Sequence, residues 1–203
     1  MIYSAQGVVG IGSSMGGPAA LARIVPLLPA DFPVPVLIVQ HMPPQFTKLL
    51  ASQLNDSSVL RVREAVDGAA LEPGDVWIAP GDFHMTLARH RGGGGRAHIR
   101  LHQGPAENSC RPAVDVLFAS MASIFGGRAL AAVLTGMGQD GRRGAALLKA
   151  MGAPVLAQDE ASSVVWGMPG SVVGAGLADA ILPLDAIASE IIARVAREAE
   201  CRR

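Results

Sequence analysis

The sequence predicts an α/β fold in which a doubly wound, mostly parallel sheet carries flanking helices and an antiparallel edge hairpin. Short apolar runs, which are typical of buried strands, alternate along the chain with segments whose apolar residues recur at the helical period. Between residues 84 and 102 the period changes to two around four consecutive glycines at 92–95, which favours a hairpin with a flexible tip.

Strands of the parallel sheet are predicted where short runs are rich in apolar residues and are bounded by polar, glycine or proline residues. These strands are expected at residues 8–11, 34–39, 60–66, 76–80, 130–134 and 155–157. After the last of them, the chain is rich in glycine as far as Gly176, and this stretch is predicted to be irregular.

Helices are predicted where apolar residues lie three or four positions apart. The first helix is expected to open at Pro18 and to be bent or shortened by Pro26, and the last is expected to be capped by Asp185. The apolar residues expected on the core-facing sides of the five helices are Leu21, Ile24, Val25 and Leu28; Phe46, Leu49, Leu50 and Leu54; Val114, Leu117, Phe118 and Met121; Ala145, Leu147 and Leu148; and Ile187, Ile191 and Val195.

Composition narrows the possible classes of function. The 203 residues are enough for one domain with a sizeable core, and the 17% of charged residues is below the usual share of about 25%, which excludes a disordered chain. Seventeen basic residues balance seventeen acidic ones, and aromatic residues make up only 4%. Neither an electrostatic attraction to nucleic acid nor rings for base stacking are therefore expected.

Cysteine content and the uncharged segments bear on the compartment. Cys110 and Cys201 are too few for a disulfide framework or a multi-thiol zinc site, so two free thiols and a cytoplasmic location are expected. The uncharged stretches 1–22 and 161–178 contain several glycines and serines, which argues against insertion into a membrane or a targeting signal.

The glycine-rich segment between the first strand and the first helix, residues 10–18, fits three motifs to different degrees. A dinucleotide fingerprint fails because Met15 stands where its third glycine is needed, and a P-loop fails because Pro18-Ala19 replaces its Lys-Ser/Thr pair. A nucleophile elbow fits, with Ser14 between Gly12 and Gly16. A plain glycine-rich turn explains the segment equally well.

Two more strand ends supply partners for a serine nucleophile. His41 follows the second strand, where it could serve as the general base, and Asp140 lies between a buried strand and a helix. Asp140 would either cap that helix or accept the ring N–H of His41 and stabilise the imidazolium. His98 and His102 alternate with apolar residues on a predicted strand, so no metal site is expected.

Six segments resemble the catalytic domain of the CheB family, the bacterial chemotaxis protein-glutamate methylesterases, and they occur in the same order. They are Gly10-Ile11-Gly12-Ser13-Ser14-Met15-Gly16-Gly17, Ile38-Val39-Gln40-His41-Met42-Pro43-Pro44, Ile78-Ala79-Pro80-Gly81, Arg111-Pro112-Ala113-Val114-Asp115, Leu134-Thr135-Gly136-Met137-Gly138-Gln139-Asp140-Gly141 and Ala157-Gln158-Asp159-Glu160-Ala161-Ser162.

The resemblance implies a cytoplasmic serine hydrolase that needs no cofactor. It would release methanol from glutamate methyl esters on chemoreceptors, and many family members also deamidate receptor glutamines. By resemblance, Ser14 is the nucleophile, His41 the base and Asp140 the acid, and the backbone N–H of Met137 is an oxyanion donor. The N–H of Met15, beside the nucleophile, is the second candidate donor.

Two departures from the family pattern matter. The family motif usually reads Gly-Ala-Ser-Thr-Gly-Gly. In this chain Ser13 replaces its Ala and Met15 replaces its Thr, so the hydroxyl of Ser13 competes with that of Ser14 as the candidate nucleophile. Residues 1–203 are expected to form a single catalytic domain without the receiver domain of typical members. A protein-binding module without catalytic activity and a phosphate- or nucleotide-binding module remain as alternatives, and the sequence carries no signal for the oligomeric state.

Overall fold

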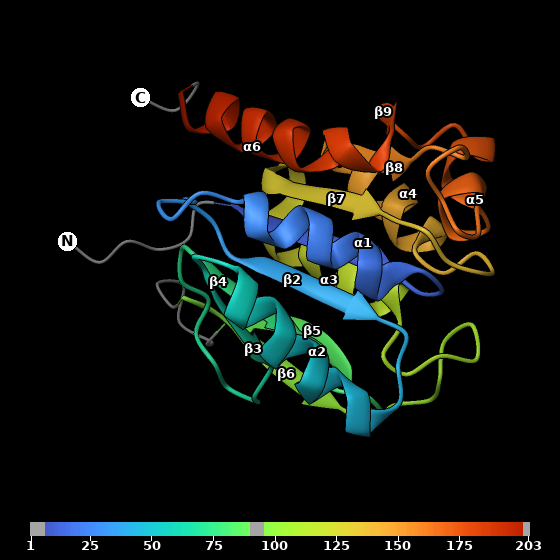
Figure 1. The fold of residues 1–203 in the computed structure, drawn as a ribbon. Coiled ribbons are helices and arrows are strands. Elements are labelled where there is room, and N and C mark those ends of the chain that lie inside the picture. Colours follow the sequence, from blue (N-terminus) through green and yellow to red (C-terminus); the bar gives the residue numbers. More distant parts are fainter. Residues whose placement is uncertain (1–6, 90–95, 201–203) are drawn as a thin grey trace.

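A parallel sheet forms the centre of the molecule in the computed structural model, which describes residues 7–89 and 96–200. Its seven strands follow the order β3-β4-β2-β1-β7-β8-β9 over these residues, and all neighbours pair in parallel (Figure 1). They are β1 (Val8–Ser13), β2 (Val36–Gln40), β3 (Arg61–Glu64), β4 (Asp75–Ile78), β7 (Ala129–Val133), β8 (Val155–Gln158) and β9 (Ala180–Leu182). The direction of strand addition reverses at β1, and such a switch point is the usual ligand site of an open α/β sheet.

Helices cover both faces of this sheet, which confirms the predicted doubly wound fold. The first face carries α1 (Gly17–Ile24), η1 (Val25–Leu27), α2 (Pro44–Ser57) and α6 (Leu184–Glu200). The second face carries α3 (Val114–Phe125), η2 (Gly126–Arg128), α4 (Arg142–Ala150) and α5 (Met168–Gly174). None of the described helices is both long enough and apolar enough to cross a membrane.

Strand β1 brings α3 unusually close to the sheet. The side chains of Val9 and Ile11 belong to the core under α1, whereas Gly10 and Gly12 face α3. A Cβ atom at Gly12 would lie 2.4 Å from Val114, and one at Gly10 would lie 2.5 Å from the sulfur of Met121. The glycines therefore serve the packing of α3 as well as the turn that follows.

The hairpin consists of β5 (His84–Arg89) and β6 (Ala97–His102), which pair antiparallel as predicted. It forms a two-stranded sheet of its own and does not extend the hydrogen bonds of the large sheet, which differs from the expected edge position. Its apolar side chains, Met85, Leu87 and Ile99, pack in the same core as α3. The glycines at 92–95, predicted to form a flexible tip, lie outside the described residues.

Several local predictions need correction. Residues 168–174 of the stretch predicted to be irregular form α5, and β9 follows it. Asp185 does not cap α6: it lies in the first turn and pairs with Arg23, while the hydroxyl of Ser162 accepts the N–H of Leu184 at 2.9 Å. The expected shortening at Pro26 is confirmed, because α1 ends at Ile24 and continues as a 3-10 turn.

The core-facing side of α2 is only partly as predicted. Leu50 and Leu54 are buried, but Phe46 and Leu49 are 47% and 54% exposed. Thr47 takes the buried position because its hydroxyl donates to Glu64 at 2.6 Å and accepts the N–H of Gly81 at 3.2 Å. A buried hydroxyl whose hydrogen bonds are satisfied in this way cannot be recognised from the spacing of apolar residues. In α4, Leu147 is likewise half exposed.

Replacing Gly12 should destabilise the fold. A Gly12→Ala substitution inserts a methyl group against Val114, and such overpacking costs roughly 1–3 kcal/mol. Gly174→Ala is the matched control because a Cβ there meets nothing within 4 Å, and alanine is the better helix former. Urea unfolding should show a lower midpoint for Gly12→Ala and an equal or higher one for Gly174→Ala. Equal midpoints for all three proteins would contradict this packing argument.

Candidate active site

Ser14 and His41 directly follow two neighbouring strands. β1 and β2 pair in parallel with Ser13 opposite Gln40, and the backbone N–H of His41 donates to the carbonyl oxygen of Ser13 at 3.0 Å. Ser14 and His41 are the next residues in this register. They therefore lie side by side at the carboxyl edge of the sheet, at the switch point.

The alternation of side chains along a strand separates the two candidate serines. Ser13 and Gln40 are both buried, and the hydroxyl of Ser13 donates to Gln40 Oε1 at 2.7 Å. This pair faces α1, where a Cβ at Gly17 would lie 1.9 Å from Gln40 Oε1. One residue further along, the alternation turns Ser14 and His41 toward α3. The hydroxyl of Ser13 is thus occupied and enclosed on the opposite side of the sheet.

Gln40 also ties the two strand ends together. Its side-chain amide donates to the carbonyl oxygens of Ser14 at 2.8 Å and His41 at 3.0 Å. No role for Gln40 was predicted from the sequence. A polar side chain at the end of an otherwise apolar strand was the available signal, because a buried amide needs partners.

The ring of His41 is held by Asp140. His41 Nε2 and Asp140 Oδ2 lie 2.7 Å apart, and both side chains are largely buried. Asp140 also accepts the backbone N–H groups of Val114 at 2.6 Å and Asp115 at 2.9 Å, which are the first two residues of α3. The carboxylate therefore sits at the positive end of this helix, where a negative charge is stabilised.

These contacts shift both pKa values. Burial alone would raise the pKa of Asp140, but the hydrogen bonds from His41 and from the N–H groups of Asp115 and Val114 outweigh it and hold this pKa below its usual range. Burial alone would lower the pKa of His41, but Asp140 and the thiol of Cys110 raise it to about 9. The pair therefore favours a carboxylate beside an imidazolium.

Asn108 and Asp115 surround Asp140 from the side of α3. The amide of Asn108 donates to Asp115 at 2.9 Å and to Asp140 at 3.1 Å. Asp115 in turn accepts the N–H of Gly144 in α4 at 2.8 Å. Asn108 belongs to none of the patterns recognised in the sequence, and its role becomes visible only when the loop before α3 folds over the end of β7.

The two candidate oxyanion donors lie in loops that are bonded to each other. The hydroxyl of Thr135 donates to the carbonyl oxygen of Met15 at 2.9 Å, and the N–H of Ser14 donates to the carbonyl oxygen of Thr135 at 3.0 Å. Within the described residues, the N–H groups of Met15 and Met137 donate to no protein acceptor. Both side chains are largely exposed, so these loops form an open rim beside Ser14.

A shallow cavity of about 370 Å³ opens beside His41, on the side away from Asp140. Its lining includes Cys110, whose sulfur lies 3.5 Å from His41 Nδ1. Arg111 forms another part of the wall, and its guanidinium binds Asp82 at 3.0 Å through Nε and the carbonyl oxygen of Gly104 at 2.9 Å. Arg111 thus binds a carboxylate within the chain.

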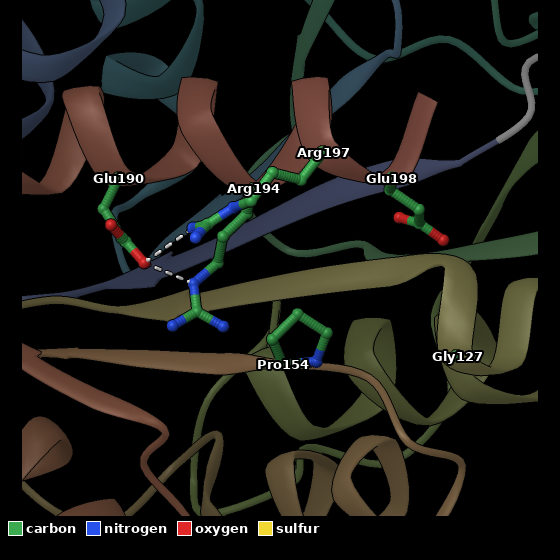
Figure 2. Close-up of a pocket in the computed structure, with 6 residues that line it drawn as sticks. All are labelled: Gly127, Pro154, Glu190, Arg194, Arg197 and Glu198. Carbon is green, nitrogen blue, oxygen red and sulfur yellow. Dashed lines mark hydrogen bonds and ion pairs between the residues drawn. The ribbon is translucent and has the colours of Figure 1, made fainter. Parts of the chain in front are cut away.

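A second cavity, of about 410 Å³, lies at the opposite, amino-terminal edge of the sheet, next to the starts of β7 and β8 (Figure 2). There Glu190 accepts hydrogen bonds from Arg194 at 2.6 Å and from Arg197 at 3.5 Å. Its lining residues are Gly127, Pro154, Glu190, Arg194, Arg197 and Glu198, so it holds no serine, cysteine or histidine that could form a nucleophile–base pair. The candidate active site is therefore the edge that carries Ser14.

This edge has the parts needed for acyl transfer. It combines a serine in a tight turn, a histidine oriented by a carboxylate, and two N–H groups on neighbouring loops. The described contacts do not include a hydrogen bond between Ser14 Oγ and His41, and such bonds often tighten only when substrate is bound. Among the described residues, no group of three or more His, Cys, Asp or Glu side chains is arranged to hold a metal ion.

Comparison with known proteins shows the family of this chain. The family model described as CheB methylesterase matches residues 9–191. The chain is 44% identical to the Thermotoga maritima CheB methylesterase catalytic domain, with a TM-score of 0.89 over 94% of this chain and 98% of that structure.

Two longer relatives are also similar to this chain. A protein-glutamate methylesterase/protein-glutamine glutaminase of Trichodesmium erythraeum is 53% identical over 93% of this chain and 53% of its own length. A second protein of that name, from Caulobacter vibrioides, is 55% identical over 91% of this chain and 52% of its own length. The chain spans about half the length of these relatives. It belongs to the CheB methylesterase family.

Proposed function

We propose that residues 1–203 form one catalytic domain that hydrolyses the methyl esters of glutamate side chains on a chemoreceptor protein in the cytoplasm. The observation that supports this proposal most directly is the hydrogen bond of 2.7 Å between His41 and Asp140, one strand away from Ser14. A histidine held in this way can act on the nearest hydroxyl as a general base.

In the proposed mechanism, Asp140 fixes the tautomer of His41. Because Nε2 faces the carboxylate, the neutral ring carries its proton on Nε2 and its lone pair on Nδ1. Nδ1 takes the proton of Ser14 as Oγ attacks the ester carbonyl, and the imidazolium then gives this proton to the departing methoxide. Water hydrolyses the acyl-enzyme by the same proton transfers in reverse order, which yields glutamate and restores Ser14.

The developing oxyanion needs donors that are already in place. The N–H groups of Met15 and Met137 are free of protein acceptors within the described residues, and the Thr135 side chain links their two loops. In a partly buried site, a donor of this kind is typically worth 10²–10³ in kcat, on the order of 3–4 kcal/mol. We therefore assign them to the oxyanion of the tetrahedral intermediate.

A glutaminase activity is a second proposal for the same site. Attack of Ser14 on a glutamine side chain gives the same acyl-enzyme and releases ammonia in place of methanol. The named relatives carry both activities in their names, which favours this proposal. A folded protein as substrate also suits the open rim of Met15 and Met137 better than a small molecule would.

Removing the proposed nucleophile or base should abolish ester hydrolysis. With methylated receptor as substrate, Ser14→Ala and His41→Ala should each lower the rate of methanol release by about 10⁴–10⁶. The reason is that Ser14, His41 and Asp140 act as a unit. Ser13→Ala is the control and should stay within about tenfold of the unmodified protein, since its hydroxyl bonds Gln40 on the other side of the sheet. If Ser13→Ala lost activity and Ser14→Ala kept it, Ser14 would not be the nucleophile.

The pH dependence should follow the protonation of His41. Only the neutral ring accepts a proton, so kcat/KM should rise with pH toward the His41 pKa of about 9. Asp140→Asn removes a hydrogen bond that raises this pKa, so the rise should move to lower pH while the plateau falls. Asp179→Asn is the matched control: Asp179 also accepts a backbone N–H, from Val155 at 2.8 Å, but at the far edge of the sheet. An unshifted profile in Asp140→Asn would contradict this assignment.

A further inference from the structure

Cys110 is not isolated in the active site but is the first member of a hydrogen-bonded chain. Its sulfur lies 3.5 Å from His41 Nδ1, and His41 Nε2 lies 2.7 Å from Asp140 Oδ2. Thiol, imidazole and carboxylate therefore follow one another in the order required to activate a nucleophile. In the described contacts, this chain is complete, whereas the corresponding contact from Ser14 to His41 is absent.

The loop before α3 holds Cys110 firmly. Its backbone exchanges two hydrogen bonds with Glu107, at 2.8 and 3.1 Å. Asn108 and Ser109 both adopt left-handed backbone conformations, with φ of 51° and 61°, which turn the chain so that the Asn108 side chain reaches Asp140. The sulfur is thus fixed beside the ring by the same loop that surrounds the carboxylate.

The neutral His41 ring can accept one hydrogen bond, and Cys110 occupies that position. Asp140 takes the N–H on Nε2, so the only lone pair is the one on Nδ1. The thiol hydrogen of Cys110 and the hydroxyl hydrogen of Ser14 must therefore compete for it. Any group that becomes attached to this sulfur would stand beside the nitrogen that the proposed mechanism needs.

The sulfur is also accessible. Cys110 is partly exposed and lines the cavity of about 370 Å³ beside His41. Apolar ring carbons of Pro43, Pro44 and Pro112 form much of the remaining wall. The charged groups facing His41 from the elements around it are Asp140 and, across the cavity, the ion pair of Asp82 with Arg111. A small reagent can therefore enter and reach the thiol.

We propose that Cys110 and His41 form a thiol–imidazole pair that makes Cys110 a second active-site nucleophile, open to covalent modification by small disulfides. Modification blocks ester hydrolysis reversibly because the attached group fills the space beside His41. This effect on hydrolysis rests on the proposed function of Ser14 and His41, whereas the reactivity of the thiol does not.

The modification is a thiol–disulfide exchange. The imidazolium of His41 stabilises the Cys110 thiolate, and this thiolate attacks one sulfur of the disulfide. The bond between the two reagent sulfurs breaks, one half stays on Cys110 as a mixed disulfide, and the other leaves as a thiolate that can take the proton from the imidazolium. The raised pKa of His41, to which Cys110 itself contributes, agrees with a protonated ring beside this sulfur.

The rate of reaction with 5,5′-dithiobis(2-nitrobenzoate) tests the pair directly. A Cys201→Ser background leaves Cys110 as the single thiol of the chain. At pH 6.5, where an ordinary thiol is only about 1% ionised, Cys110 should release thionitrobenzoate at least tenfold faster than it does in the same background with His41→Ala. Asp140→Asn is the second variant and should also slow the reaction, so the test does not depend on the folding of His41→Ala alone.

Methanol release from methylated receptor provides the second readout. The reagent should abolish hydrolysis in the Cys201→Ser protein, and dithiothreitol should restore it. Cys110→Ala should keep its own untreated rate after treatment. Ser14→Ala should still release thionitrobenzoate quickly although it hydrolyses no ester, so a failure of the proposed function can be recognised separately. Equal labelling rates with and without the His41 ring would overturn the pairing, and full esterase activity after complete labelling would overturn the block.

Discussion

The carboxylate of Asp140 is the point on which the active-site edge is assembled. It joins its own segment to two others that are distant in the sequence: His41, which follows β2, and residues 108–115, in which Asn108 precedes α3 and Val114 and Asp115 begin it. The positive end of α3 keeps this buried group ionised, and the ionised group orients His41. Helix packing and catalytic geometry therefore depend on the same charge.

The position of α3 depends in turn on residues without side chains. Gly10 and Gly12 let the helix lie directly on β1, which brings its first N–H groups level with the end of the strand. On the other side of the same strand, Gly17 leaves room for Gln40, whose amide spans the backbone of Ser14 and His41. The glycine-rich segment thus provides close approach on both faces of the sheet, in addition to the turn at Ser14.

The features that depend on periodicity could be predicted from the sequence. Apolar runs located six of the seven parallel strands, and the placement of polar residues at strand ends indicated Ser14, His41 and Asp140. Contacts made by loops could not be predicted in this way, because neither Asn108 nor Cys110 follows a periodic pattern, and their position depends on how the segment before α3 folds. The last strand, β9, has only three residues, too few to produce a recognisable pattern.

The raised pKa of His41 has a consequence for how such a site would work near neutral pH. With a pKa of about 9, only about 1% of the rings are neutral at pH 7, which by itself would reduce the rate about a hundredfold. A receptor segment lying over the cavity would exclude water from the imidazolium and disfavour its charge. Under the proposed function, binding of the substrate would itself lower this pKa. The open form of the site would then be part of its chemistry, because covering by the substrate protein favours the neutral base near neutral pH.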